Sequence, residues 1–113
     1  MKLSASILAL SLMSGVAMAD GHGDAIAEGK KLAFDRGKGN CLACHMIDDG
    51  QMAGNQGPPL MMMKQRFPNI EDLRAQIADP TVRNPRTSMP PFGKHGILTE
   101  DELDKVVQYI YSL

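Results

Sequence analysis

Tryptophan is absent from this 113-residue sequence, and other aromatic residues are scarce, with two tyrosines and three phenylalanines. A domain of this size buries a limited fraction of its surface and often needs a cross-link or a cofactor to complete its core. The shortage of large flat side chains therefore predicts a bulky apolar group that the amino acids themselves do not supply.

The sequence also lacks an excess of either charge, since 12 Lys and Arg face 13 Asp and Glu for a formal net charge of −1. A chain without a basic surplus gives no reason to expect nucleic acid or an anionic membrane surface as its partner. We therefore look for function in a site rather than in overall charge.

Long hydrophobic runs are missing beyond the amino terminus. Lys2 precedes an apolar stretch over residues 3–13, and Ala17-Met18-Ala19 has the small-residue pattern of a cleavage site. These features predict a secretory signal peptide over residues 1–19 and a single mature domain over residues 20–113. The apolar stretch is too short and too interrupted by serine to span a membrane, so we expect no span in the mature chain and a periplasmic location.

No segment alternates polar and apolar residues for long enough to predict a sheet, and no internal repeat is visible. Apolar residues instead recur at helical spacing, which predicts an all-α domain of a few short helices. Thr99 and Glu102 form a capping box at the start of the last helix, and Asn69 is a good N-cap for another. The expected helices cover residues 23–36, 60–66, 70–78 and 99–113.

Cysteine is nearly absent, and both cysteines lie in the segment Cys41-Leu42-Ala43-Cys44-His45. Cys-x-x-Cys-His is the attachment signal for c-type haem, in which the thiols form thioethers and the histidine binds the iron. The sequence thus predicts one covalent haem c per chain, with Cys41 and Cys44 holding the porphyrin and His45 as an axial ligand. Since both thiols are consumed by attachment, none remains as a nucleophile.

Three other uses of two cysteines were weighed against haem attachment. A thiol oxidoreductase needs a βαβ context that is not predicted here. A zinc site with His22 or His95 would normally pair two regularly spaced knuckles, and only one is present. A plain disulfide is compatible with export but does not explain a histidine directly after Cys44.

The second axial ligand of the iron must come from the opposite face of the ring. Met89 is the favoured candidate, because Pro90 and Pro91 stiffen its loop and a preorganised loop loses little entropy in holding a weak thioether ligand. The run of methionines at residues 61–63 and the imidazole of His95 remain alternatives.

The haem motif, the segment Gly57-Pro58-Pro59-Leu60, the Met89-Pro90 pair and the closing helix together resemble class I cytochromes c. The resemblance implies that the first proline after the glycine, Pro58 here, offers its carbonyl to the proximal histidine. The chain further resembles the SoxX family, the monohaem subunit of the SoxAX complex of sulfur oxidation. The resemblance extends from about Ala25 to Leu113. The segments that carry it are residues 39–45, Arg66-Phe67-Pro68, Asp79-Pro80, Asn84-Pro85 and residues 89–99.

The SoxX resemblance implies an electron-transfer subunit that is not catalytic by itself. It would form a heterodimer with a SoxA-like haem subunit. That subunit would couple thiosulfate to a cysteine of the carrier protein SoxYZ, which is the L-cysteine S-thiosulfotransferase reaction. The electrons would pass to a small downstream cytochrome c. Two other hypotheses stay open: a free monohaem cytochrome shuttle of a respiratory chain, and a haem enzyme or gas sensor with an open iron position.

Overall fold

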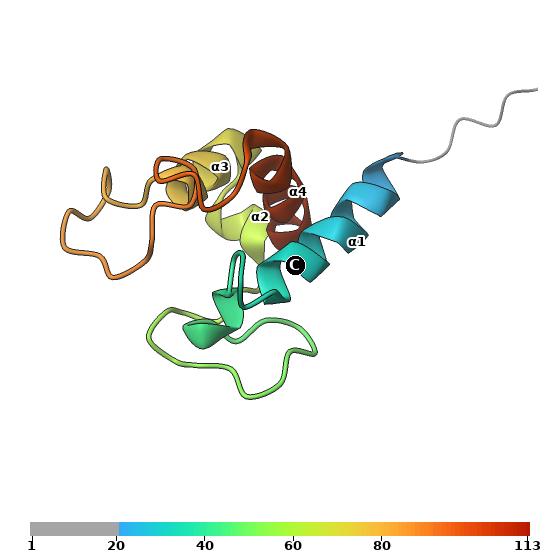
Figure 1. Ribbon diagram of the computed structural model, residues 1–113, viewed down its shortest axis with the longest axis horizontal. Coiled ribbons are helices and arrows are strands. Elements are labelled where there is room, and N and C mark those ends of the chain that lie inside the picture. Colours follow the sequence, from blue (N-terminus) through green and yellow to red (C-terminus); the bar gives the residue numbers. More distant parts are fainter. Residues whose placement is uncertain (1–20) are drawn as a thin grey trace, which may run out of the picture.

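The computed structural model describes residues 21–113, so the predicted signal peptide lies outside the described residues. Four α-helices and one short 3₁₀ turn follow one another along this part of the chain (Figure 1). Between residues 21 and 113 the only extended pairing is one isolated parallel bridge joining Ile47 and Leu60. The predicted all-α architecture is confirmed. The elements are α1 (Gly21–Phe34), η1 (Cys41–Ala43), α2 (Met63–Arg66), α3 (Ile70–Ala78) and α4 (Glu100–Tyr111).

The predicted helix over residues 60–66 is too long at its amino end. Leu60 pairs with Ile47 in the bridge, and Met62 adopts a left-handed conformation with φ 53°. A helix cannot pass through a residue with that backbone conformation, so α2 begins only at Met63. The first helix also differs from prediction, because α1 spans Gly21–Phe34 rather than residues 23–36.

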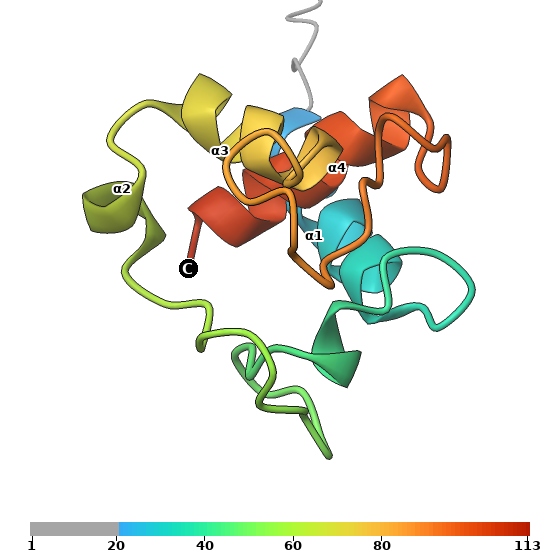
Figure 2. The ribbon, with the colours of Figure 1, turned by 90° about the vertical axis from the view of Figure 1, so that its left-hand side faces the viewer.

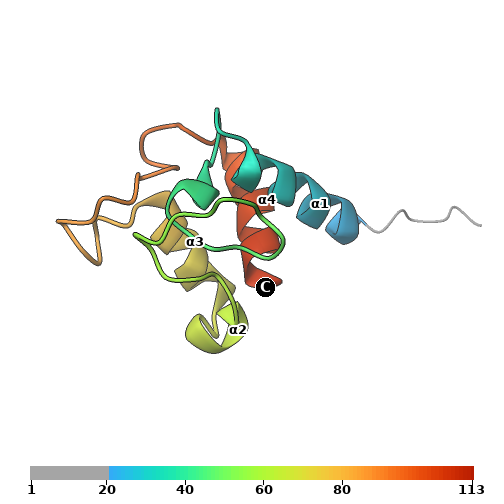
Figure 3. The same ribbon diagram turned by 90° about the horizontal axis from the view of Figure 1, so that it is seen from below.

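Helix α1 lies against α4, and Gly29 allows their close approach (Figures 1 and 3). A Cβ atom at Gly29 would overlap the backbone carbonyl of Lys105 in α4. On either side of this contact, Phe34 stacks edge-on against Tyr109 with ring centroids 6.1 Å apart, and Lys105 Nζ pairs with Glu28 at 2.5 Å. The missing side chain of Gly29 thus permits the close packing of α1 against α4.

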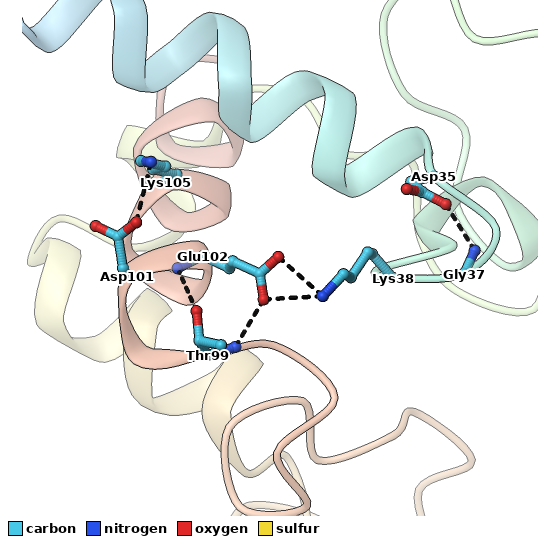
Figure 4. Close-up of polar contacts among 7 residues, drawn as sticks. All are labelled: Asp35, Gly37, Lys38, Thr99, Asp101, Glu102 and Lys105. Carbon is cyan, nitrogen blue, oxygen red and sulfur yellow. Dashed lines mark hydrogen bonds and ion pairs between the residues drawn. The ribbon is translucent and has the colours of Figure 1, made fainter.

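The start of α4 has the predicted capping box (Figure 4). Thr99 Oγ1 accepts from the backbone N–H of Glu102 at 3.2 Å, and Glu102 Oε1 accepts from the N–H of Thr99 at 3.0 Å. The Glu102 carboxylate also pairs with Lys38 Nζ at 3.0 Å. The cap therefore joins α4 to the segment that precedes the Cys-x-x-Cys-His motif.

The core gathers between α3 and α4 and on the side of α1 that faces them. Leu73 and Ile77 of α3 meet Leu103, Val106 and Ile110 of α4, all buried. Figure 2 shows these helices grouped together and the segment from Cys41 to Leu60 lying below them. Within residues 21–113, no helix combines the length and the apolar character that crossing a bilayer requires.

Candidate functional site: the haem c centre

The Cys-x-x-Cys-His segment folds as one tight turn. Asn40 enters it in a left-handed conformation with φ 48°, η1 follows, and the N–H of His45 donates to the carbonyl of Cys41 at 2.9 Å. One turn of backbone places the two cysteines and the histidine on the wall of a single cavity, which all three line. Both cysteines are free, half-buried thiols in this structure.

Burial raises the pKa of the Cys41 thiol to about 11, and the neighbouring Cys44 adds a smaller effect in the same direction. Before attachment Cys41 is therefore a neutral thiol at physiological pH, which suits an apolar wall. The Cys44 thiol donates a weak hydrogen bond to Gln56 Oε1, with 3.5 Å between the sulfur and the oxygen.

The imidazole of His45 is held by the backbone of a distant turn. His45 Nδ1 lies 2.7 Å from the carbonyl oxygen of Pro58. Because a carbonyl can only accept, Nδ1 must carry the proton, and Nε2 keeps its lone pair available for a metal. Gly57 makes this approach possible, since a Cβ atom there would overlap the His45 ring.

The segment that supplies Pro58 runs beside the haem motif and is bonded to it at regular intervals. The N–H groups of Gly54, Gly57 and Leu60 donate to the carbonyls of Leu42, Cys44 and Met46, each at 2.8 Å. These three bonds fix the register between the two segments. The bonds from Gly57 and Leu60 flank Pro58 and Pro59 and so bring this turn beside His45.

The cavity has a volume of about 600 Å³, within the range of about 300–1,000 Å³ typical of sites for small molecules and cofactors. Its walls come from the haem motif, from α2, α3 and α4, and from the loop between α3 and α4. Most of its side chains are apolar, as a porphyrin face requires: Leu60, Met63, Phe67, Leu73, Ile77, Met89, Phe92, Ile97, Val106 and Ile110.

The charged residues in the cavity wall are all basic: Arg36, Lys38 and Arg66. Haem carries two propionate carboxylates, and a wall with cations and no carboxylate suits them electrostatically. The cavity also holds two thiols spaced for attachment and an imidazole with a free nitrogen, and its walls are largely apolar. The residues present fit haem c.

The candidates for the second axial ligand are placed differently. Met89 is half-buried and lines the cavity, whereas Met61, Met62 and His95 do not line it and are exposed. Met63 also lines the cavity, but it is 1% exposed and its Sδ accepts from Arg66 Nη1 at 3.4 Å. Met89 and Met63 are thus the two methionines that share a cavity with His45.

The loop that carries Met89 is anchored to the end of α3 and has a local hydrogen bond at Met89 itself. The N–H groups of Gly93 and Lys94 donate to the carbonyl of Ala78, at 3.1 and 3.0 Å, where α3 ends. The N–H of Met89 donates to Thr87 Oγ1 at 3.1 Å. These bonds add to the stiffness expected from Pro90 and Pro91.

Two polar residues of the cavity wall were not among the predicted site residues. Arg66, the last residue of α2, donates from Nη1 to the carbonyl of Pro59 at 2.9 Å. Gln76 of α3 has a buried Oε1 with no hydrogen-bond partner among the described residues. Gln76 belongs to no motif, and Arg66 was named only as part of the Arg66-Phe67-Pro68 segment of the SoxX resemblance. The packing of α2 and α3 against the haem segment brings both to the wall.

Comparison with known proteins agrees with this site. The family described as cytochrome c oxidase, cbb3-type, subunit III matches residues 24–110. An uncharacterized lipoprotein of Aquifex aeolicus (strain VF5) is 36% identical over 76 residues, covering 66% of this chain and 37% of that protein. The cbb3-type cytochrome c oxidase subunit CcoP of Azospirillum sp. (strain B510) is 33% identical over 93 residues, covering 66% of this chain and 27% of that subunit.

The chain spans about a third or less of the length of these two curated relatives. Domains of the matched family bind covalently attached haem c, act together with redox partners and are typically periplasmic or extracellular. The match covers far more than half of this chain and includes the haem motif, the cavity and α4. This protein therefore belongs to the cbb3-type subunit III family of cytochrome c domains and is a monohaem cytochrome c-type electron-transfer domain.

Proposed function

We propose that this domain is a one-electron relay whose iron is bound by His45 and Met89 and whose porphyrin is bound by Cys41 and Cys44. Haem iron supplies a reversible change between the ferric and ferrous states when bound. The observation that carries the ligand assignment is the shared cavity, which His45 and Met89 both line. Pro58 fixes the proton on His45 Nδ1, which leaves Nε2 for the metal.

The residues around this cavity favour relay over catalysis. Apolar side chains from α3, α4 and the Met89 loop exclude water from the ring, which lowers the reorganisation that accompanies a change of charge. The sequence has no third cysteine, so no thiol remains for covalent chemistry once the haem is attached.

For the partner, we propose a SoxA-like haem subunit, with this chain as the SoxX-type subunit of a periplasmic SoxAX complex. In that role it accepts electrons from the coupling of thiosulfate to the SoxYZ carrier cysteine and passes them to a small cytochrome c. The support is the resemblance of residues 39–45 and 89–99 to that family. Export would follow from the segment over residues 1–19.

A free shuttle of a respiratory chain is the second candidate, and the family match is compatible with it. The matched family and one relative are named for a terminal oxidase subunit, so electron delivery to such an oxidase fits the same domain equally well. Both candidates use the same His45 and Met89 ligand set.

Affinity purification of the tagged holoprotein from cells grown with and without thiosulfate separates the two. The SoxAX role predicts a stoichiometric second haem subunit in the purified material and reduction of the haem by thiosulfate only when the carrier protein is added. If no second haem subunit co-purifies, and membranes that contain the oxidase rapidly oxidise the reduced haem of this protein, the SoxAX role is rejected in favour of the shuttle. Carbon monoxide binding to the reduced protein would instead indicate an open iron position and reject both.

A further inference from the structure

The turn that faces His45 contains two successive prolines, and this leaves it short of backbone anchors. Pro58 and Pro59 have no N–H group, so neither can join the series of bonds made by Gly54, Gly57 and Leu60. Their carbonyls are the only backbone groups through which the two prolines can be held. The Pro58 carbonyl accepts from His45, and the Pro59 carbonyl accepts from Arg66.

Arg66 connects this turn to the buried core. Its Nη1 has two hydrogens and lies 2.9 Å from the Pro59 carbonyl and 3.4 Å from Met63 Sδ. Met63 is 1% exposed, and its N–H donates to the carbonyl of Leu113 at 3.0 Å, just beyond the end of α4. One guanidinium nitrogen therefore bridges the proline turn and a side chain packed against the last helix.

We propose that Arg66 is a positioning residue for the proximal histidine. It acts through Pro59: by holding that carbonyl against the core, it fixes the peptide that directs the Pro58 carbonyl at His45 Nδ1. Without this bridge only the bonds from Gly57 and Leu60 restrain the two prolines, so the His45 hydrogen bond opens more often. The inference rests on the proposed role of His45 as an iron ligand.

The test measures solvent exchange of the His45 Nδ1 proton in the reduced, diamagnetic holoprotein by NMR. Breaking one net hydrogen bond changes an opening equilibrium several-fold. We expect the proton to exchange several-fold faster in Arg66→Met than in the parent, and we expect Arg66→Lys, which keeps a cationic donor, to recover part of the protection. Arg66→Gln gives the same comparison should Arg66→Met fail to fold.

Lys64→Met is the matched control, because Lys64 lies in the same helix, carries the same charge and does not line the cavity. Its His45 proton should exchange as in the parent. Backbone amide exchange in α4 shows whether any acceleration comes from global unfolding. Equal exchange in Arg66→Met and Lys64→Met, or acceleration matched throughout α4, would overturn the inference.

The two levels of the proposal fail differently. If the His45 ring protons of the reduced parent lack the large shifts produced by a porphyrin directly above them, the ligand assignment fails whatever Arg66 does. If those shifts are present but the His45 proton exchanges in the Arg66 variants as it does in Lys64→Met, the ligand assignment stands and the positioning role is wrong.

Discussion

At the scale of single residues, two methionines share a cavity with His45, but their sulfur atoms have different surroundings. The Met63 sulfur accepts a hydrogen bond from Arg66, and the side chain packs in the core. Met89 projects from a loop anchored to the end of α3. A sulfur engaged by a guanidinium in the core is less available to a metal than one carried by a stiff loop, and this contrast supports the proposed Met89 ligand.

Replacing Met89 by alanine should remove the sulfur-to-iron charge-transfer band in the red region of the oxidised spectrum. It should also lower the reduction potential by a sizeable part of the roughly 0.8 V range that axial ligands span, because thioether ligation favours ferrous iron. Visible spectroscopy and potentiometric titration measure both effects. Met61→Leu, Met62→Leu and Met63→Leu should keep the band. If Met63→Leu loses the band and Met89→Ala keeps it, Met63 and not Met89 is the iron ligand.

At the scale of elements, the α1–α4 contact depends on a position without a side chain. Gly29→Ala would drive a methyl group into the Lys105 carbonyl, and backbone cannot move aside as a flexible side chain can. We expect a loss of about 1–3 kcal/mol in the free energy of unfolding, the usual cost of overpacking. Urea denaturation of the holoprotein measures it.

Gly21→Ala is the control for this substitution. Gly21 also lies in α1, and a Cβ atom there meets nothing within 4 Å. Its stability should equal or slightly exceed that of the parent, since alanine favours helix more than glycine does. Similar losses in both variants would show that helix propensity, and not the contact with α4, explains the effect.

The capping box of α4 should make stability depend on pH. The Thr99 N–H, and after it Lys38, hold the pKa of Glu102 below its usual value of 4.5. The carboxylate therefore contributes stability above about pH 4.5, and this contribution disappears as the pH falls through the lower folded-state pKa. Glu102→Gln should be less stable than the parent at pH 7, and the difference should shrink by pH 3.

Urea denaturation at several pH values tests this prediction. Lys38→Met should also lower the free energy of unfolding at pH 7. In the Glu102→Gln background the same substitution should lower it little further, because the Lys38–Glu102 pair is already broken. A difference between parent and Glu102→Gln that stays constant from pH 7 to pH 3 would contradict the assigned cause.

At the scale of the whole molecule, the haem site forms the centre around which the two halves of the domain meet. The cavity of about 600 Å³ has walls from the haem motif, α2, α3, α4 and the Met89 loop. Burying one large apolar side chain contributes about 1.5–3 kcal/mol, and several such side chains line this cavity. A haem that covers them would therefore supply stabilisation comparable with the whole free energy of unfolding of a small domain.

A Cys41→Ser, Cys44→Ser double variant should therefore lose covalent haem and cooperative unfolding together. We expect weak helical circular dichroism and poorly dispersed amide resonances, where the holoprotein should give a sharp thermal transition. The Gly21→Ala variant, purified in parallel, controls for handling. A haem-free double variant that melts cooperatively at the parent temperature would show that the polypeptide core suffices.

The sequence by itself determined the features that depend on neighbouring residues. The Thr99–Glu102 capping box, the Asn69 cap and the bounds of α3 follow from local hydrogen bonding, and the structure confirms them. The haem prediction rests on the spacing of Cys41, Cys44 and His45, and the family match confirms haem c. The predicted start of α2 at Leu60 was wrong, because the pairing of Leu60 with Ile47 outweighed the local preference for helix.

Only the tertiary structure decided which distant groups meet. The packing of α2 and α3 around the cavity decides which methionines line it, namely Met63 and Met89 but not Met61 or Met62. The same packing brings Arg66 to the proline turn. Helical periodicity says which face of a segment is apolar and not what covers it. Local chemistry therefore set the cofactor, while packing between segments far apart in the sequence set the surroundings of its iron.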